Sequence, residues 1–242
     1  MKVQETVIWQ CEKLLRDIIN QIPMSDKKPF LETAKVYLKF SSTRDWKTLC
    51  SLLDLLNDTE LAKENFEKYG ISGPTKYDSQ GEKHLRLYGI LNTIYLQKSA
   101  IEEFIRLANH PDNAIFFKEL RGLKLLELRN IVGAHTIDYL ENGNKNPHQI
   151  QRTSIDQKSI RTLDSNNNFK LYNLNELLDE YNKTASRIFF LATEKFVMTV
   201  FKNGGNKRSV YLKRTSYIKE VLDGNIVLAI SEDQDPIIVK IT

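Results

Sequence analysis

A long amphipathic pattern in the middle of the chain constrains the fold more than any other feature. Between residues 82 and 108, apolar side chains recur three and four positions apart, which places them on one side of an α-helix. Asn109-His110-Pro111-Asp112 interrupts the pattern, and helical spacing returns from Phe116 to about Asp138. We therefore expect a central core helix and a second helix packed antiparallel to it. The apolar residues of the central helix are Leu87, Tyr88, Leu91, Ile94, Tyr95, Ile101, Phe104, Ile105 and Ala108.

Helical patterns also fill the chain before the central helix. Asn57 is followed three positions later by Glu60, which has the form of a capping box, so a separate helix is expected to begin there and to end near Gly70. The polar, breaker-rich residues 71–81 predict a loop. The other predicted helices cover residues 3–22, 29–40 and 46–56.

The pattern changes from helical to extended after Gly143. Residues 150–154, 159–163 and 169–172 have the composition or the alternation of strands. The asparagine-rich run 165–168 is typical of a turn. Together these features predict a small β-hairpin.

The rest of the chain is predicted to hold one more long helix and a second hairpin. Asn173 with Glu176 has the form of a capping box, and the apolar spacing that follows continues to about Phe201. Two apolar runs within residues 226–241, separated by an acidic turn, predict a C-terminal β-hairpin.

Composition places these elements in a mainly α fold. The chain has 242 residues, of which 41% are hydrophobic and 27% charged, so it can bury a real core. We expect an antiparallel helical bundle with a small β-hairpin insertion and a C-terminal β-hairpin.

No apolar run is long enough for a membrane span, so we expect a cytoplasmic protein without membrane contact. The expected segments are an N-terminal helical part at 1–80, a helical core at 81–201 with the hairpin near 150–172, and a basic segment with the last hairpin at 202–242.

Cysteine usage argues against a metal or redox site. Cys11 and Cys50 are the only cysteines, and they lie outside any CxxC spacing or histidine cluster. We interpret both as buried thiols rather than as a disulfide or as zinc ligands. The sequence also lacks a Walker loop and a GxGxxG motif. We therefore expect neither a metal nor a cofactor.

The net charge of +4 is unevenly distributed. Residues 202–219 contain lysines and arginines but no acidic residue, and Tyr211 and Tyr217 lie between the charges. Such a segment suits the phosphates and bases of a nucleic acid. It is equally typical of a solvated linker, for which Gly204-Gly205-Asn206 provides a flexible turn. The candidate RNA-binding side chains are Lys207, Arg208, Lys213 and Arg214.

The pattern with the most chemical content is Leu128-Arg129-Asn130-Ile131-Val132-Gly133-Ala134-His135, which lies in the second central helix. An arginine grips phosphate oxygens through two parallel hydrogen bonds, and a histidine transfers a proton near neutral pH. Together the two side chains can cleave RNA without a metal. His84, His110 and His148 lack an arginine at a suitable distance, so we interpret them as surface or capping residues.

A structural interpretation of the same residues is also open. Arg129 would then pair with a nearby acid such as Glu127 or Asp138, and His135 would be a helix-end histidine favoured by the helix dipole. On an ideal helix the two candidate side chains are roughly 120° apart around the axis and about 9 Å apart along it. Gly133 is a candidate for a local bend that changes this angle.

The antiparallel helices, with Arg129, Asn130 and His135 on the later one, resemble the HEPN superfamily, which includes many prokaryotic ribonucleases. The resemblance covers roughly residues 82–140. It implies that arginine and histidine line a cleft between two protomers of a homodimer. His135 would be the general acid or base, Arg129 the phosphate clamp and Asn130 the residue that orients one of them. It also implies a toxin or phage-defence effector whose activity a protein partner neutralises.

The chemistry of metal-free cleavage explains why a dimer is expected. The reaction needs a base for the ribose 2′-OH, a cation for the phosphorane and an acid for the leaving oxygen, whereas one motif supplies one histidine. A two-fold contact repeats each residue and supplies a second histidine. The expected products carry 2′,3′-cyclic phosphate and 5′-hydroxyl ends, and EDTA should not stop the reaction.

Two other functions fit the same sequence. One is a catalytically silent module of the HEPN-like fold that binds RNA or a nucleotide as a scaffold. The other is a protein-interaction module whose C-terminal hairpin offers a strand edge to another chain.

Overall fold

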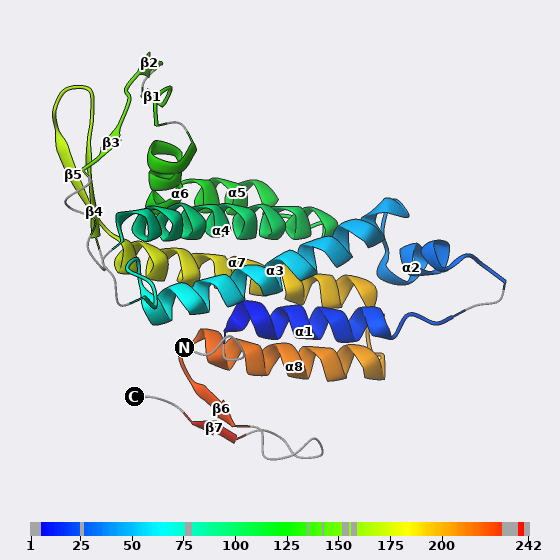
Figure 1. Ribbon diagram of the computed structural model, residues 1–242. Helices are drawn as coiled ribbons and strands as arrows, with labels where there is room; N and C mark the ends of the chain where they lie inside the picture. Colours follow the sequence, from blue (N-terminus) through cyan, green and yellow to red (C-terminus); the bar gives the residue numbers. More distant parts are fainter. Residues whose placement is uncertain are drawn as a thin grey trace. The chain divides into compact units, whose positions relative to one another are not determined.

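The computed structural model is mainly helical, as the sequence patterns predict (Figure 1). Its described residues form eight α-helices, one π-helical turn and seven short strands. Among them, no helix combines the length and the apolar character that a bilayer crossing requires. The described residues are 6–24, 27–75, 79–134, 136–141, 143–151, 155, 159–228 and 237–239.

The chain packs as two compact units, each assembled from segments that are distant in sequence. The units divide the chain at positions other than the boundaries expected after residues 80 and 201. Three long helices, α3 (Arg44–Tyr69), α4 (Gln80–Leu107) and α7 (Leu174–Val200), each contribute residues to both units. Unit 1 consists of Met1–Glu60, Ala100–Ala114 and Ala185–Thr242, and unit 2 consists of Leu61–Ser99 and Ile115–Thr184.

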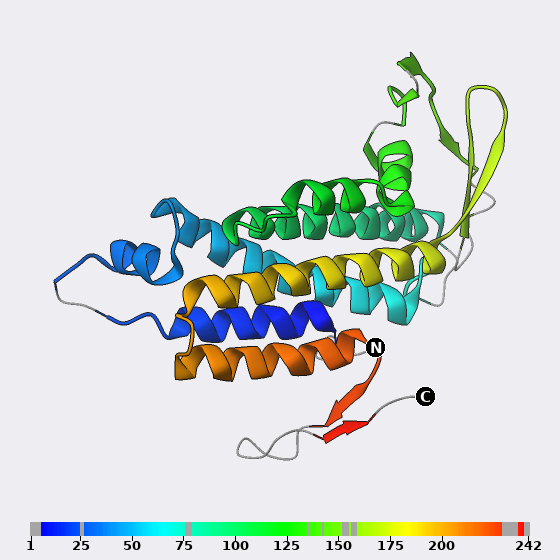
Figure 2. The same ribbon diagram turned by 180° about the vertical axis from the view of Figure 1, so that it is seen from behind.

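In unit 1, α1 (Val7–Asn20) and α8 (Asn206–Leu222) lie side by side, as Figures 1 and 2 show from opposite sides. The Thr6 hydroxyl caps α1 by accepting a hydrogen bond from the backbone N–H of Trp9. The Gln21 amide donates to the Tyr211 hydroxyl at 2.7 Å, which joins the end of α1 to the middle of α8. The short helix α2 (Phe30–Leu38) follows α1 and ends at a left-handed residue, Lys39.

Aromatic rings form the core of unit 1. Phe104 of α4 packs edge-on against Phe189 of α7, with ring centroids 5.1 Å apart, and lies 5.5 Å from Phe196. Cys11 is fully buried beside this core, and burial raises the pKa of its thiol to about 12. Cys50 is half-buried, and both thiols are free. The prediction of a buried free thiol is therefore confirmed for Cys11 and holds in part for Cys50.

The helix break predicted at Asn57 is wrong, because α3 runs without interruption from Arg44 to Tyr69. The buried face continues at helical spacing through this region, from Leu56 to Glu60 and Lys63. The Thr59 hydroxyl donates to the Leu56 carbonyl oxygen inside the helix. A capping box requires an extended first residue, and continuous burial of this face keeps Asn57 helical.

A buried lysine joins three helices in unit 2. Lys63 of α3 is only 6% exposed, and its ammonium donates to the Gln97 amide oxygen of α4 at 3.1 Å. It also donates to the Asn182 amide oxygen of α7 at 2.8 Å. The neighbouring Tyr181 is fully buried and donates its hydroxyl to the Ile94 carbonyl oxygen of α4. This polar group sets how α3 and α7 meet α4 within unit 2.

The second central helix is not continuous, in contrast to the helix expected from Phe116 to about Asp138. It is divided into α5 (Asn113–Arg121), α6 (Lys124–Arg129) and the π-helical turn η2 (Asn130–Ala134). Leu123 is extended and buried, and it turns the chain between α5 and α6. Because the chain turns here, α5 and α6 do not form one helix. The leucines Leu125, Leu126 and Leu128 of α6 are buried after this turn.

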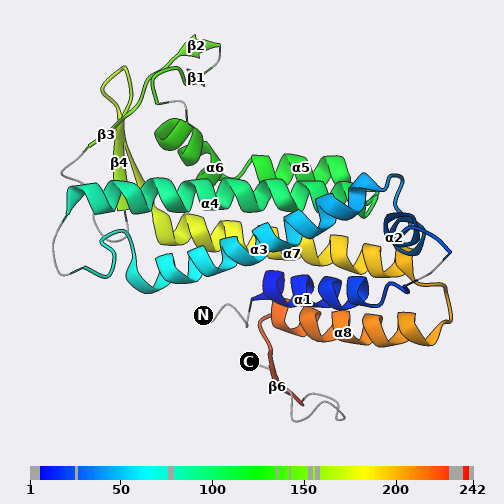
Figure 3. The same cartoon turned by 45° about the vertical axis from the view of Figure 1, so that its right-hand side comes forward.

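The predicted β-hairpin is confirmed for the strands expected at residues 159–163 and 169–172, whereas of the strand expected at 150–154 only Ile150 is extended in a sheet and 152–154 lie outside the described residues. Strand β3 (Gln149–Ile150) pairs with β4 (Ser159–Leu163), which pairs with β5 (Phe169–Asn173), all antiparallel. Figure 3 shows this sheet at the end of unit 2 where α4 begins. A second, two-stranded hairpin, β1 (Leu140–Glu141) with β2 (Asn144–Lys145), was not predicted. Each strand is too short to show an alternating pattern in the sequence.

The capping box predicted at Asn173 is confirmed at the start of α7. The Asn173 side chain accepts from the backbone N–H groups of Asn175 and Glu176, and its amide donates to the Glu176 carboxylate at 2.6 Å. At the C-terminus, β6 (Ile226–Leu228) pairs with β7 (Ile237–Val239), as predicted. The turn between them lies outside the described residues.

We expect Lys63→Met to lower the free energy of unfolding by about 1–3 kcal/mol, because the buried Gln97 oxygen and the half-buried Asn182 oxygen each lose the hydrogen bond from this ammonium. Urea unfolding followed by circular dichroism measures this difference. Lys118→Met, at an exposed position of α5, is the matched control and should change stability little. An equal loss in both variants would mean that the buried ammonium has no special role.

Candidate functional site

Arg129 is held in a defined orientation at the junction of α6 and η2. Its guanidinium lies over the ring of Tyr95 on α4, 4.0 Å from the ring centroid. Its Nη1 donates to the side-chain oxygen of Asn130 at 3.1 Å. Both Arg129 and Asn130 are half-buried, so the cation keeps a face toward solvent. This is the arrangement that an oriented phosphate ligand would need.

The structural interpretation in which Glu127 partners Arg129 is wrong. Glu127 instead accepts a hydrogen bond from the Lys170 ammonium of β5 at 3.0 Å. Within the described part of the chain, Arg129 makes no ion pair with a carboxylate. Its positive charge is therefore not neutralised by these neighbours.

The π-helical turn occupies the part of the motif between Arg129 and His135. π-helical turns are rare and are frequently found at functional sites. The turn changes the angular step per residue, so the roughly 120° separation expected for an ideal helix does not apply. His135 itself lies outside the described residues. Thr136, the next residue, donates its hydroxyl to the Val132 carbonyl oxygen at 2.9 Å.

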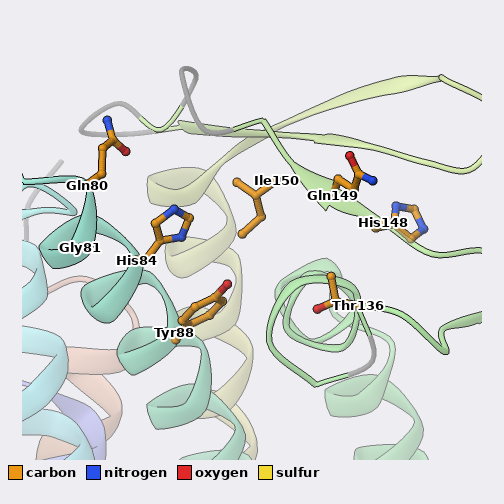
Figure 4. A pocket seen from close by; sticks show the side chains of 8 residues that line it. All are labelled: Gln80, Gly81, His84, Tyr88, Thr136, His148, Gln149 and Ile150. Atoms are coloured by element: carbon orange, nitrogen blue, oxygen red, sulfur yellow. The ribbon is translucent and has the colours of Figure 1, made fainter.

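A pocket of about 700 Å³, here called the His84 pocket, lies near this turn in unit 2. Figure 4 shows side chains from three segments around it. His84 and Tyr88 come from α4, Thr136 from the turn after η2, and Ile150 from β3. The pocket is also lined by Gln80, Gly81, His148 and Gln149.

His148 occupies an unusual position in the wall of this pocket. Its backbone N–H donates to the Thr136 carbonyl oxygen at 2.9 Å, and its ring packs edge-on against Tyr139 with centroids 5.4 Å apart. Both ring nitrogens are buried and have no hydrogen-bond partner among the described residues. A buried polar atom without a partner costs about 1–3 kcal/mol. The side chain is therefore not explained as a surface or capping histidine.

A smaller pocket of about 210 Å³ is also lined by His148, and its lining holds more acidic than basic side chains. Its walls include the carboxylates of Glu127, Glu141 and Asp164. Hydrogen bonds, first from the Asn168 side chain, lower the pKa of Asp164 and keep it ionised. Burial raises the pKa of Tyr172 above its ordinary value, so this hydroxyl stays neutral at physiological pH. Lys170 also lines this pocket and pairs with Glu127, so Glu141 and Asp164 leave an excess of negative charge, which is unfavourable for a phosphate.

The remaining described histidine has the ordinary role that the sequence predicted. His110 lies before α5, and its Nδ1 accepts a hydrogen bond from the backbone N–H of Asp112 at 3.1 Å. Burial is the main cause that lowers the pKa of His110 from its usual value. The prediction of a capping residue is confirmed for His110.

The basic segment is not a linker, since most of it forms α8. Tyr211 is 2% exposed in the core of unit 1, so it cannot stack on a base. Arg214 pairs with Asp17 at 2.6 Å, and Lys207 lies 6.0 Å from the ring centroid of Tyr37. At about 100° per residue, Lys213 points to a different side of α8 from Lys207 and Arg214.

The four predicted RNA-binding residues therefore do not form one stripe along α8. Lys207 and Lys213 are exposed, and Arg208 is half-buried with Nη1 3.5 Å from the carbonyl oxygens of Met198 and Phe201. All four belong to unit 1, whereas Arg129 and Asn130 belong to unit 2. Their role in RNA binding stays a prediction.

Comparisons with known proteins add no assignment to these residues. No family model, curated protein or solved structure matches the chain. Among the described residues, no group of three or more His, Cys, Asp or Glu side chains is placed to hold a metal ion. Arg129 with its partners and the His84 pocket are therefore the features that bear on function.

Sequence reasoning missed His84 and His148 as members of one pocket. The sequence held one signal for His84, because His84, Tyr88 and Tyr95 recur at helical spacing on one side of α4. His148 offered no such signal. Its place beside the α4 side chains depends on the path of the chain through β1, β2 and β3, which local patterns do not specify.

We expect His148→Phe to raise the free energy of unfolding by about 1 kcal/mol or more, because it removes two buried nitrogens that lack partners and keeps a ring against Tyr139. Urea unfolding measures the change. His84→Phe, at a half-buried ring in the same pocket, is the control and should give no such gain. A destabilised His148→Phe variant would show that these nitrogens have partners in solution.

Proposed function

We propose that this protein is a metal-independent endoribonuclease of the HEPN type that acts as a dimer. The observation that carries the proposal is the state of Arg129, a half-exposed cation oriented by Asn130 and Tyr95 and not neutralised by Glu127. The proposed chemistry needs a cation in this state. The mainly helical fold and the π-helical turn at the motif are consistent with it.

In this proposal Arg129 clamps the phosphate at the cleavage site. The Asn130 oxygen takes one donor of the guanidinium and so directs the remaining donors toward a ligand. His135 takes the proton from the ribose 2′-OH or gives one to the leaving 5′-oxygen. The phosphodiester is broken by the 2′-oxygen, which leaves a 2′,3′-cyclic phosphate and a 5′-hydroxyl end. Because no water enters this step, no metal-bound hydroxide is required.

A second copy of the chain would supply the second histidine, and α4 offers a face for such a contact. Leu85, Gly89, Asn92 and Leu96 are exposed and recur four, three and four positions apart, which places them in one stripe. Leu85 is 73% exposed, which is unusual for a large apolar side chain. The stripe lies next to the side of α4 on which Tyr95 holds Arg129. Pairing two such stripes would bring the two motifs together.

The purified protein is expected to cleave RNA in the presence of EDTA and to leave cyclic phosphate ends. Arg129→Ala and His135→Ala should each lower the cleavage rate at least about 100-fold, because each removes a group that acts in the transition state. Gel analysis of labelled RNAs, with end-group determination, measures both effects.

Two variants serve as matched controls for that experiment. Arg121→Ala removes an arginine of α5 that lies 5.4 Å from the ring centroid of Phe117 on the same helix, and His110→Asn keeps a side chain that can cap α5. Both should cleave at the wild-type rate. Equal rates in all variants, or no cleavage by the folded protein, would reject the nuclease. Binding without cleavage would favour the silent RNA-binding module.

Leu85→Glu is expected to convert the dimer to a monomer and to lower cleavage, because a buried carboxylate at the contact is unfavourable. Sedimentation velocity measures the mass, and the cleavage assay measures the consequence. Ile115→Glu changes another exposed apolar residue, on α5, and should leave the dimer intact. A monomeric wild-type protein that still cleaves RNA would show that the second histidine is not needed.

A further inference from the structure

The His84 pocket has no role in the cleavage chemistry proposed above. Its volume of about 700 Å³ lies within the range of small-ligand sites. Figure 4 shows His84 and Tyr88 on one side of the hollow, with Ile150 of β3 across from them and Thr136 on the neighbouring turn. Thr136 directly follows His135 in the chain, so the candidate motif ends next to a residue that lines the pocket.

The described residues that line the pocket combine apolar surface with uncharged polar groups. The eight described residues that line it include neither a carboxylate nor a lysine or arginine. Hydrogen-bonding groups come from the amides of Gln80 and Gln149, the hydroxyl of Thr136 and the imidazole of His84. Neutral donors and acceptors of this kind match the edge of a nucleobase better than they match a phosphate.

Two aromatic rings in the pocket form a platform for stacking. The rings of His84 and Tyr88 have centroids 5.9 Å apart and planes inclined by 32°. Tyr88 is 44% exposed, so one face of the platform is open to a ligand. Unpaired RNA bases commonly stack on tyrosine and histidine rings, whereas bases within a duplex cannot reach them.

The platform and the candidate phosphate clamp lie on the same side of α4. Tyr88 and Tyr95 are seven residues apart, which is about two helical turns and roughly 10 Å along the axis. Arg129 lies directly over Tyr95. A base stacked on Tyr88 would therefore place the adjoining sugar and phosphates along α4 toward the guanidinium.

We propose that the His84 pocket binds one unpaired nucleobase of the RNA substrate, stacked on Tyr88, next to the cleaved phosphate. This inference rests on the proposed function and names its substrate class as single-stranded RNA or a single-stranded loop. Gln80 and Gln149, at opposite sides of the pocket, read the edge of the base. The smaller pocket, which shares His148 with this one, carries an excess of carboxylates and so disfavours the RNA backbone.

The test measures binding separately from cleavage, in an Arg129→Ala background that leaves the RNA intact. The probe is a short fluorescein-labelled single-stranded RNA, compared with a duplex of the same sequence by fluorescence anisotropy. The single strand should bind at least about 10-fold more tightly than the duplex. Tyr88→Ala should weaken binding of the single strand about 10-fold or more, whereas Tyr88→Phe should preserve it.

Phe169→Ala is the control for a general loss of aromatic surface. Phe169 is exposed on β5 in the same unit, outside the His84 pocket, and its loss should leave binding unchanged. Equal binding by Tyr88→Ala and its parent, or a loss with Phe169→Ala instead, would overturn the proposed pocket. Cleavage without any dependence on Tyr88 would overturn the pocket alone. Tyr88-dependent binding by a protein that never cleaves RNA would overturn the nuclease and leave the pocket standing.

Discussion

The buried ammonium of Lys63 is the interaction on which unit 2 depends. It connects α3 to amide oxygens of α4 and α7, and Tyr181 adds a second polar link between α7 and α4. Polar contacts are directional, so they fix the register of these helices more closely than apolar packing alone. With α4 fixed in this way, its outer side presents Tyr95 to the guanidinium of Arg129.

The surroundings of Arg129 depend on the path of the chain from α5 through α6 to η2. Extended Leu123 separates α5 from α6, and α6 passes into a π-helical turn at Asn130. Glu127, on the opposite side of α6, forms an ion pair with Lys170 of β5. These features leave the arginine with a ring and an amide as partners, and such partners orient a cation without cancelling its charge.

The chemical groups around the motif divide into two kinds of surface. The described lining of the His84 pocket includes two aromatic rings and no charged side chain, whereas the smaller pocket is lined by three carboxylates and one lysine. The cation of Arg129 attracts an anionic ligand, whereas the excess of carboxylates in the smaller pocket repels one. Under the proposed function, this difference in charge favours the Arg129 side of unit 2 for the RNA backbone.

Local sequence signals determined the long helix α4, the capped start of α7, the β4–β5 hairpin and the Arg129-Asn130 motif, because each depends on residues close together in the chain. Tertiary structure alone decided the rest. It kept α3 helical through Asn57, because a buried face outweighs a local capping pattern. It buried Tyr211 in unit 1 and placed β3 beside α4, so that His148 and His84 line one pocket. The continuity of α3, the burial of Tyr211 and the position of β3 depend on contacts between residues far apart in the sequence, and local sequence patterns do not predict such contacts.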